Sequence, residues 1–242
     1  KWGEKLYPFT KTGKKWILEL PFSTPVNYVQ ICIDGQEVLS PELPIAHGYG
    51  RPYNYIELPD EDGLFELRDV PHGTLTQEFY KSQISDNWEK LILYLPPCVP
   101  SAGLPVLYLQ HGFGESEISW STTGKVNLLM DNLIAAGKIK PFAIVMGNGM
   151  VKQRIDGELK LNRALYGQML VEEILPMIEK KYQFGGSKEK RGMAGLSMGS
   201  VQTTRTICEH PELFSEVGLF SGFLRHRIVG DEEHDGIISK AC

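Results

Sequence analysis

The spacing of apolar and polar residues changes about a third of the way along the chain. Up to about residue 70, short apolar stretches are separated by turns that are rich in proline. This pattern predicts short strands at 16–20, 29–33 and 53–58, the second of them closed by an Asp34-Gly35 turn. We therefore expect residues 1–70 to form a small all-β domain of the β-sandwich type.

Residues 71–242 show a different pattern, in which continuous apolar runs alternate with helical periodicity. Such runs are typical of buried strands in a mostly parallel sheet. Apolar residues at three- and four-residue spacings predict a helix over 165–182, with a kink at Pro176. A second helix is predicted at 200–209, and strands at 91–95, 106–109, 142–146, 192–194 and 217–220. This order predicts an α/β fold in which helices cover one sheet.

Composition narrows the function classes without naming one. The net charge is −5, with 25 Lys and Arg scattered among 30 Asp and Glu, so no nucleic-acid footprint is expected. No apolar run reaches the roughly 20 residues of a membrane span, and any signal peptide is expected to be already removed. The four cysteines show no metal-ligand spacing and are interpreted as thiols. We expect neither a metal nor an organic cofactor.

The segment Gly195-Leu196-Ser197-Met198-Gly199 matches G-x-S-x-G between a short apolar strand and a predicted helix. In that context the serine occupies a sharp turn, and the glycines remove side chains that would clash. The hydroxyl then projects above the sheet beside the N-terminus of the helix. We predict that Ser197 is a catalytic nucleophile and that the Met198 N–H is an oxyanion donor.

A second pattern, His111-Gly112-Phe113-Gly114, follows the predicted strand at 106–109. An H-G-x-G turn in this place supplies another oxyanion donor, which we assign to the Phe113 N–H. His111 is interpreted as a structural, hydrogen-bonded residue of the turn rather than as the catalytic base. Two motifs in this order predict a serine hydrolase far more strongly than one.

Together these residues resemble the esterase D group, particularly the feruloyl esterases of carbohydrate esterase family 1, over about residues 70–225. The early β-rich segment resembles the immunoglobulin-like, early-set domain that precedes some of these esterases. The resemblance is carried by residues 111–116, Trp120, 131–135, 137–141 and 194–199 and, more weakly, by 70–73 and 94–97.

The resemblance implies a serine carboxylic-ester hydrolase of the α/β-hydrolase fold that forms an acyl-enzyme. It implies a hydroxycinnamoyl ester on arabinoxylan, a plant cell-wall polysaccharide, as substrate, and a secreted protein. Trp120 and the loop at 147–150 are candidates to line the acyl or sugar side, although core packing and a plain turn explain them equally well. Acetylxylan esterase and enterochelin-type siderophore esterase remain alternatives, as does a non-catalytic carbohydrate-binding or scaffold protein.

The triad acid and base do not fall where an α/β-hydrolase places them. Both follow the nucleophile on loops after later strands, and the sequence after 225 shows no further apolar strand. We therefore expect the C-terminal part of the hydrolase fold to be missing here, with acid and base beyond Cys242 and this chain nearly inactive alone. The weak local candidates are His234 and Asp231, with His226 and Asp235 beside them, and His210, His47 and His72 are weaker still.

Overall fold

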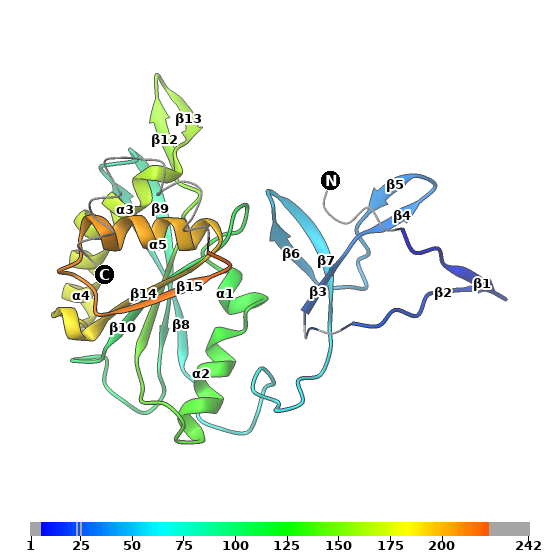
Figure 1. The fold of residues 1–242 in the computed structure, drawn as a ribbon, viewed down its shortest axis with the longest axis horizontal. Coiled ribbons are helices and arrows are strands. Elements are labelled where there is room, and N and C mark those ends of the chain that lie inside the picture. The colour runs from blue at the N-terminus through cyan, green and yellow to red at the C-terminus, as the bar shows by residue number, and fades with distance from the viewer. Residues whose placement is uncertain (1–5, 23, 25, 223–242) are drawn as a thin grey trace.

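The computed structural model describes residues 6–22, 24 and 26–222, and its centre is a six-stranded sheet (Figure 1). The strand order is β15-β14-β10-β11-β9-β8. Strands β10, β11, β14 and β15 run parallel, whereas β8 and β9 form an antiparallel edge. The bounds are β8 Thr74–Ser82, β9 Asn87–Leu95, β10 Val106–Gln110, β11 Ala143–Gly147, β14 Arg191–Leu196 and β15 Glu216–Phe220. The predicted α/β fold is confirmed.

Both faces are buried along the central strands β9, β10, β11 and β14, which explains why these strands read as continuous apolar runs. Along β9, Leu91 and Leu93 point into one core, while Ile92 and Tyr94 point into the other. The first core is covered by α3 (Tyr166–Met169), η2 (Leu170–Ile174) and α4 (Leu175–Tyr182), and the second by α1 (Ser119–Thr122) and α2 (Val126–Ala135). Each fully buried aliphatic side chain contributes about 1.5–3 kcal/mol of transfer free energy.

The predicted helix over 165–182 is present, and its irregularity precedes Pro176. Residues Leu170–Ile174 form a π-helical turn, after which α4 begins with Pro176 in its first turn. Proline has no N–H to donate, and its ring would clash with the carbonyl four residues earlier in a regular helix. The wider turn accommodates both effects while Leu170, Ile174 and Ile178 stay in the core.

The described residues of the first part contain strands and no helix, as predicted, but their strands form three separate small antiparallel sheets and not the two packed sheets of a β-sandwich. The three sheets are β1 (Thr10–Thr12) with β2 (Lys15–Ile17), β4 (Ile31–Ile33) with β5 (Gln36–Val38), and β3 (Val26–Val29), β7 (Arg51–Glu57) and β6 (Ile45–Gly48) in that spatial order. Ala46 is the only apolar side chain buried within the described residues before 70. Buried Asn54 organises the unit instead, through bonds to the backbone of Ser40 and Leu43.

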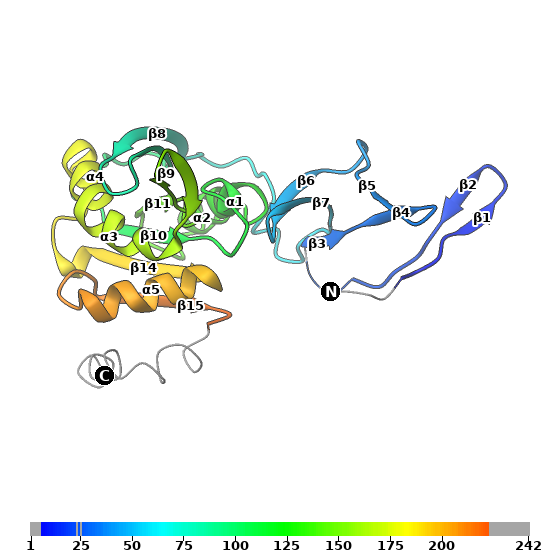
Figure 2. The ribbon, with the colours of Figure 1, turned by 90° about the horizontal axis from the view of Figure 1, so that it is seen from above.

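A segment between β7 and β8 passes beside α2 and attaches the β-rich unit to the six-stranded sheet (Figures 1 and 2). The Asn132 amide donates to the carbonyls of Leu64 and Glu66 at 2.8 and 2.9 Å. Lys125 forms an ion pair with Glu57 at 2.7 Å. Residue 70, where the sequence predicts the boundary between the two domains, lies within this segment.

The sequence did not predict several elements. The hairpin of β12 (Lys152–Ile155) and β13 (Glu158–Leu161) turns at Asp156-Gly157, where both φ angles are positive. An Asp-Gly pair is a strong hairpin signal, although the flanking residues are too polar to reveal strands. Two 3₁₀ turns, η1 (Arg163–Leu165) and η3 (Lys188–Lys190), and the edge strand β8 were also missed. Among the described residues, none of the helices is long and apolar enough to cross a membrane.

A buried carboxylate fixes the start of β8. Asp131 on α2 is 2% exposed and accepts hydrogen bonds from the Gly73 N–H at 2.9 Å and from the Tyr94 hydroxyl at 2.5 Å. It also contacts His72 Nδ1 at 2.9 Å, while Nε2 lies 3.0 Å from the Arg68 carbonyl. A protonated imidazole donates to both partners. The Asp131 bond therefore raises the pKa of His72 above its usual value.

We expect this contact to make stability depend on pH. A raised pKa in the folded state means that the His72 contribution is complete below the usual histidine value of about 6.5 and is lost as pH rises through the raised value. The melting temperature of the parent should exceed that of His72→Gln by more at about pH 5.5 than at about pH 9. His47→Gln, at an exposed position on β6, is the control for losing a histidine. An equal difference at both pH values would contradict the assignment.

Candidate active site

Ser197 occupies the sharp turn between β14 and α5 (Met198–Glu209) that its motif predicts. Its backbone has φ 78° and ψ −101°, a conformation that an L-residue adopts only under strain. The turn is held by a hydrogen bond from the Ser197 N–H to the Phe220 carbonyl of β15 at 3.0 Å. Although Ser197 stands at the N-cap position, its side chain caps none of the helix N–H groups. The hydroxyl is therefore not committed to the helix.

The two motif glycines are required by close backbone packing. A Cβ on Gly195 would lie 2.3 Å from the Gly199 carbonyl group, so the turn closes on itself. A Cβ on Gly199 would lie 2.7 Å from the carbonyl oxygens of both Gln110 and His111 at the end of β10. Gly199 thus brings the start of α5 directly against the strand that leads into the second motif.

The second motif forms a compact loop at the same edge of the sheet as Ser197. Gln110 is paired with Gly195 in the parallel ladder, so the residues that follow β10 emerge beside the serine turn. The Gly112 N–H donates to the Glu115 carboxylate at 2.8 Å, and the Gly112 carbonyl accepts from the Glu115 N–H at 3.3 Å. Met198 is the first residue of α5, where an N–H has no acceptor within the helix. The structure thus brings the predicted donors' loops together, while their oxyanion role stays a prediction.

His111 is a structural residue of this loop. It is 1% exposed, with Nδ1 at 2.7 Å from the Gly112 carbonyl and Nε2 accepting from the Gly149 N–H at 3.0 Å. An acceptor Nε2 places the ring proton on Nδ1, which donates to Gly112. Burial lowers the pKa of His111, which favours this neutral form. Both ring nitrogens are occupied, so neither is available to take a proton from Ser197.

The buried side-chain amides of Gln110 and Gln202 hold the segments around the site together, and the sequence did not single them out. Gln110 Nε2 donates to the Gly147 carbonyl at 3.3 Å, and Gln202 Nε2 donates to the carbonyls of Gly149 and Arg163, each at 3.0 Å. They join the end of β10, the loop after β11 and helix α5 into one network. Isolated glutamines carry no sequence signal for such a role, because only the fold brings them together.

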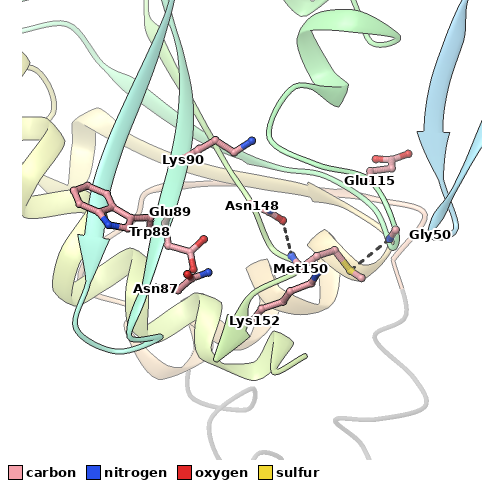
Figure 3. Close-up of a pocket in the computed structure, with 10 residues that line it drawn as sticks. Gly50, Asn87, Trp88, Glu89, Lys90, Glu115, Asn148, Met150 and Lys152 are labelled. Atoms are coloured by element: carbon pink, nitrogen blue, oxygen red, sulfur yellow. Dashed lines mark hydrogen bonds between the residues drawn. The ribbon is translucent and has the colours of Figure 1, made fainter. Parts of the chain in front are cut away.

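A cavity of about 320 Å³ opens beside the loop at 111–114, which we call the oxyanion loop after its predicted role (Figure 3). Asn148 and Met150, from the loop that is a candidate to contact substrate, line this cavity, and the Met150 sulfur accepts from the Gly114 N–H at 3.5 Å. A substrate contact of this loop stays a prediction. Trp88, at the start of β9, is 66% exposed beside the cavity. The remaining lining residues are Gly50, Asn87, Glu89, Lys90, Gly114, Glu115 and Lys152.

Trp120 lies on α1, shortly after the oxyanion loop in the chain. Its ring packs on the Phe220 ring with the centroids 5.8 Å apart, and it lines a second cavity of about 380 Å³ together with Val26 and Phe65 of the β-rich unit. Packing therefore accounts for part of its position, and a substrate contact stays a prediction.

The local acid and base candidates His226, Asp231, His234 and Asp235 lie outside the described residues. His210 ends α5, where its N–H donates to the Thr206 carbonyl at 2.8 Å, as expected for a helix-terminal residue. His47 is exposed on β6. Within the described chain, the structure therefore brings together the Ser197 turn and the loop at 111–114, whose nucleophile and oxyanion roles stay predictions.

We expect Gly199→Ala to destabilise the protein. Alanine is about 1 kcal/mol better than glycine in an ordinary helix. Here its methyl group would press on two backbone carbonyl oxygens, so we expect a net loss of about 1–3 kcal/mol and at least a tenfold loss of turnover. Gly192→Ala is the control, because a Cβ there meets its neighbours at ordinary distances of 3.4 Å or more. Denaturant titration and ester turnover measure the two effects, and a more stable Gly199→Ala protein would contradict this account.

Strain at Ser197 gives a second expectation. Ser197→Gly removes the side chain that makes a φ of 78° costly, so it should unfold at a temperature about 2–4 °C higher than the parent. Ser197→Ala keeps a Cβ and should unfold close to the parent. Equal melting temperatures for the glycine and alanine variants would show that the turn stores no such strain.

Comparison with protein families gives a match over residues 82–234 to the family described as "Putative esterase". A curated relative, the endo-1,4-beta-xylanase/feruloyl esterase of Xylanibacter ruminicola, is 36% identical over 213 residues, which are 84% of this chain. The match spans 29% of that relative, so this chain corresponds to less than a third of its length.

Solved structures show the same fold. A ferulic acid esterase is 28% identical over 60% of this chain and 59% of its own, with a TM-score of 0.53. The feruloyl esterase module from Clostridium thermocellum, solved as a serine-to-alanine mutant with sinapinate, is 21% identical over 84% of this chain and 69% of its own, with a TM-score of 0.61. The family match covers more than half of the sequence and includes both the oxyanion loop and the Ser197 turn. The chain therefore belongs to this esterase family, with an α/β-hydrolase fold.

Proposed function

We propose that this chain supplies the nucleophile and the oxyanion donors of a feruloyl esterase that releases hydroxycinnamic acids from arabinoxylan. The observation that carries the proposal is the strained Ser197 turn packed through Gly199 against the strand that leads into the oxyanion loop. A binding or scaffold protein has no need to maintain strain at an uncommitted serine hydroxyl. The Xylanibacter ruminicola relative supports the choice of ester and of polysaccharide.

The first half of the reaction forms an acyl-enzyme. Ser197 Oγ attacks the ester carbonyl carbon while its proton passes to a base, and the carbonyl oxygen becomes an oxyanion. The N–H groups of Met198 and Phe113 donate to that oxygen, and such donors are worth about 10²–10³ in rate each. The C–O bond to the sugar then breaks, and the base returns the proton to the sugar oxygen.

The second half releases the acid. Water gives a proton to the base, attacks the acyl carbon, and Ser197 Oγ leaves with that proton. Within the described residues His111 is excluded as the base by its two hydrogen bonds. We therefore propose that the acid and the base lie outside the described residues, where His234 and Asp231 are the weak local candidates.

The cavity beside the oxyanion loop suits part of a hydroxylated substrate. It presents amide, ammonium and carboxylate groups beside the exposed indole of Trp88. Aromatic faces and a few polar groups form a common pocket chemistry for such ligands. A cell-wall substrate lies outside the cell that makes the enzyme, so we also propose that the protein is secreted.

The full-length protein should hydrolyse methyl ferulate, and Ser197→Ala should lower kcat by at least about 10³-fold while the protein stays folded. Acetylated xylan and a catecholate trilactone, assayed in parallel, test the alternative esterases. Xylan binding by a parent protein that hydrolyses no ester would support the scaffold alternative. Near-parental turnover of the Ser197→Ala protein would contradict the assignment of Ser197 as the nucleophile. A parent active only on acetylated xylan or on the trilactone would overturn the choice of ester.

A further inference from the structure

The tip of the β6–β7 hairpin, Gly48–Arg51, reaches from the β-rich unit to the oxyanion loop. Its two central residues have positive φ angles, 53° at Tyr49 and 80° at Gly50, as a two-residue type I′ turn requires. In such a turn the central N–H groups point away from the ladder between the strands. They are therefore available to a neighbouring segment.

Both of these N–H groups donate to the oxyanion loop. The Tyr49 N–H donates to the Phe113 carbonyl at 3.0 Å, and the Gly50 N–H donates to the Gly114 carbonyl at 3.4 Å. Gly114 has a φ of 76°, and a Cβ there would lie 1.9 Å from Gly50 N. The two backbones are thus in direct contact, and only glycine at position 114 permits it.

These bonds complete the hydrogen bonding of the peptide groups around the proposed donor. The peptide group that carries the Phe113 N–H is fixed through its other end, because the Gly112 carbonyl is bonded to Glu115 N and His111 Nδ1. The next peptide group is fixed by Tyr49 at its carbonyl and by the Met150 sulfur at its N–H. The Phe113 Cα joins these two peptide groups, so fixing the second group limits rotation of the first and with it the direction of the Phe113 N–H.

We propose that the β6–β7 hairpin tip is a positioning element of the oxyanion loop, so that the β-rich unit contributes to catalysis through its backbone. This inference rests on the proposed function. A loop with two glycines loses much conformational entropy when it is ordered, and two bonds to a preformed turn supply that order before substrate arrives. The Lys125–Glu57 ion pair holds the end of β7 at the base of the hairpin, and the Asn132 bonds hold the segment that follows it.

The test shortens the hairpin in the full-length protein. Replacing residues 47–52 by Asn-Gly keeps a type I′ turn, because Tyr53 has an N–H to close it whereas Pro52 has none, and it retracts the tip by two residues per strand, about 7 Å. We expect kcat on methyl ferulate to fall at least tenfold with KM changed by less than about twofold. A phenylboronic acid, which becomes tetrahedral on Ser197 and places an oxygen in the oxyanion position, should bind at least tenfold more weakly. Binding of ferulate, which lacks that geometry, should stay within about twofold.

Two matched variants separate backbone from side chain. Tyr49→Asn and Arg51→Gln each keep both backbone donors and the turn, so both should retain kcat and boronate affinity within about twofold. If Tyr49→Asn alone reproduced the loss, or if the shortened hairpin raised KM instead, the tip would bind substrate and the positioning proposal would be wrong. Parental kcat in the shortened hairpin would overturn it as well. The proposed function fails separately, if the parent itself hydrolyses no ester.

A second variant covers the case in which the shortened protein does not fold. Gly114→Ala places a methyl group against Gly50 N and forces the two backbones apart without shortening the chain. Gly137→Ala is its control, with a similar φ of 66° but open space around the Cβ. We expect boronate affinity to fall at least tenfold in the first variant and to stay near the parent in the second. Equal affinities in both would overturn the proposal.

Discussion

The site depends on one close contact, between the start of α5 and the end of β10. Gly199 lies so near the carbonyl oxygens of Gln110 and His111 that no side chain fits between them. This contact sets where Ser197 stands relative to the loop at 111–114. The buried amides of Gln110 and Gln202 and the two hydrogen bonds of His111 then fix the surrounding loops relative to β10 and α5. Rigid positions matter here, because an oxyanion donor is effective only when it is aimed before the charge develops.

The sequence was most informative where local chemistry and periodicity agree. The strands with both faces buried were predicted because burial on two sides leaves a continuous apolar run. The Ser197 turn was predicted because a sharp strand-to-helix turn demands glycines at fixed spacing. These signals act over a few residues, so the sequence displays them directly.

The rest could not be predicted because it depends on contacts between distant residues. Strand β8 is half exposed at the edge of the sheet, so its apolar pattern is weak. Buried Asn54, Gln110 and Gln202 look like surface residues until the fold surrounds them with carbonyl groups. The contact of Tyr49 and Gly50 with the oxyanion loop joins residues more than 60 positions apart through backbone atoms alone, which no side-chain pattern reveals.

The small core of the β-rich unit has a consequence for the order of folding. With Ala46 as its only buried apolar side chain in the described residues before 70, the unit cannot gain much from collapsing alone. Its firm contacts are to Phe113, Gly114, Lys125 and Asn132. On the ribosome these partners emerge after the unit itself does. The part of the chain that is made first is therefore expected to acquire its structure late, once the sheet and α2 have formed a surface for it.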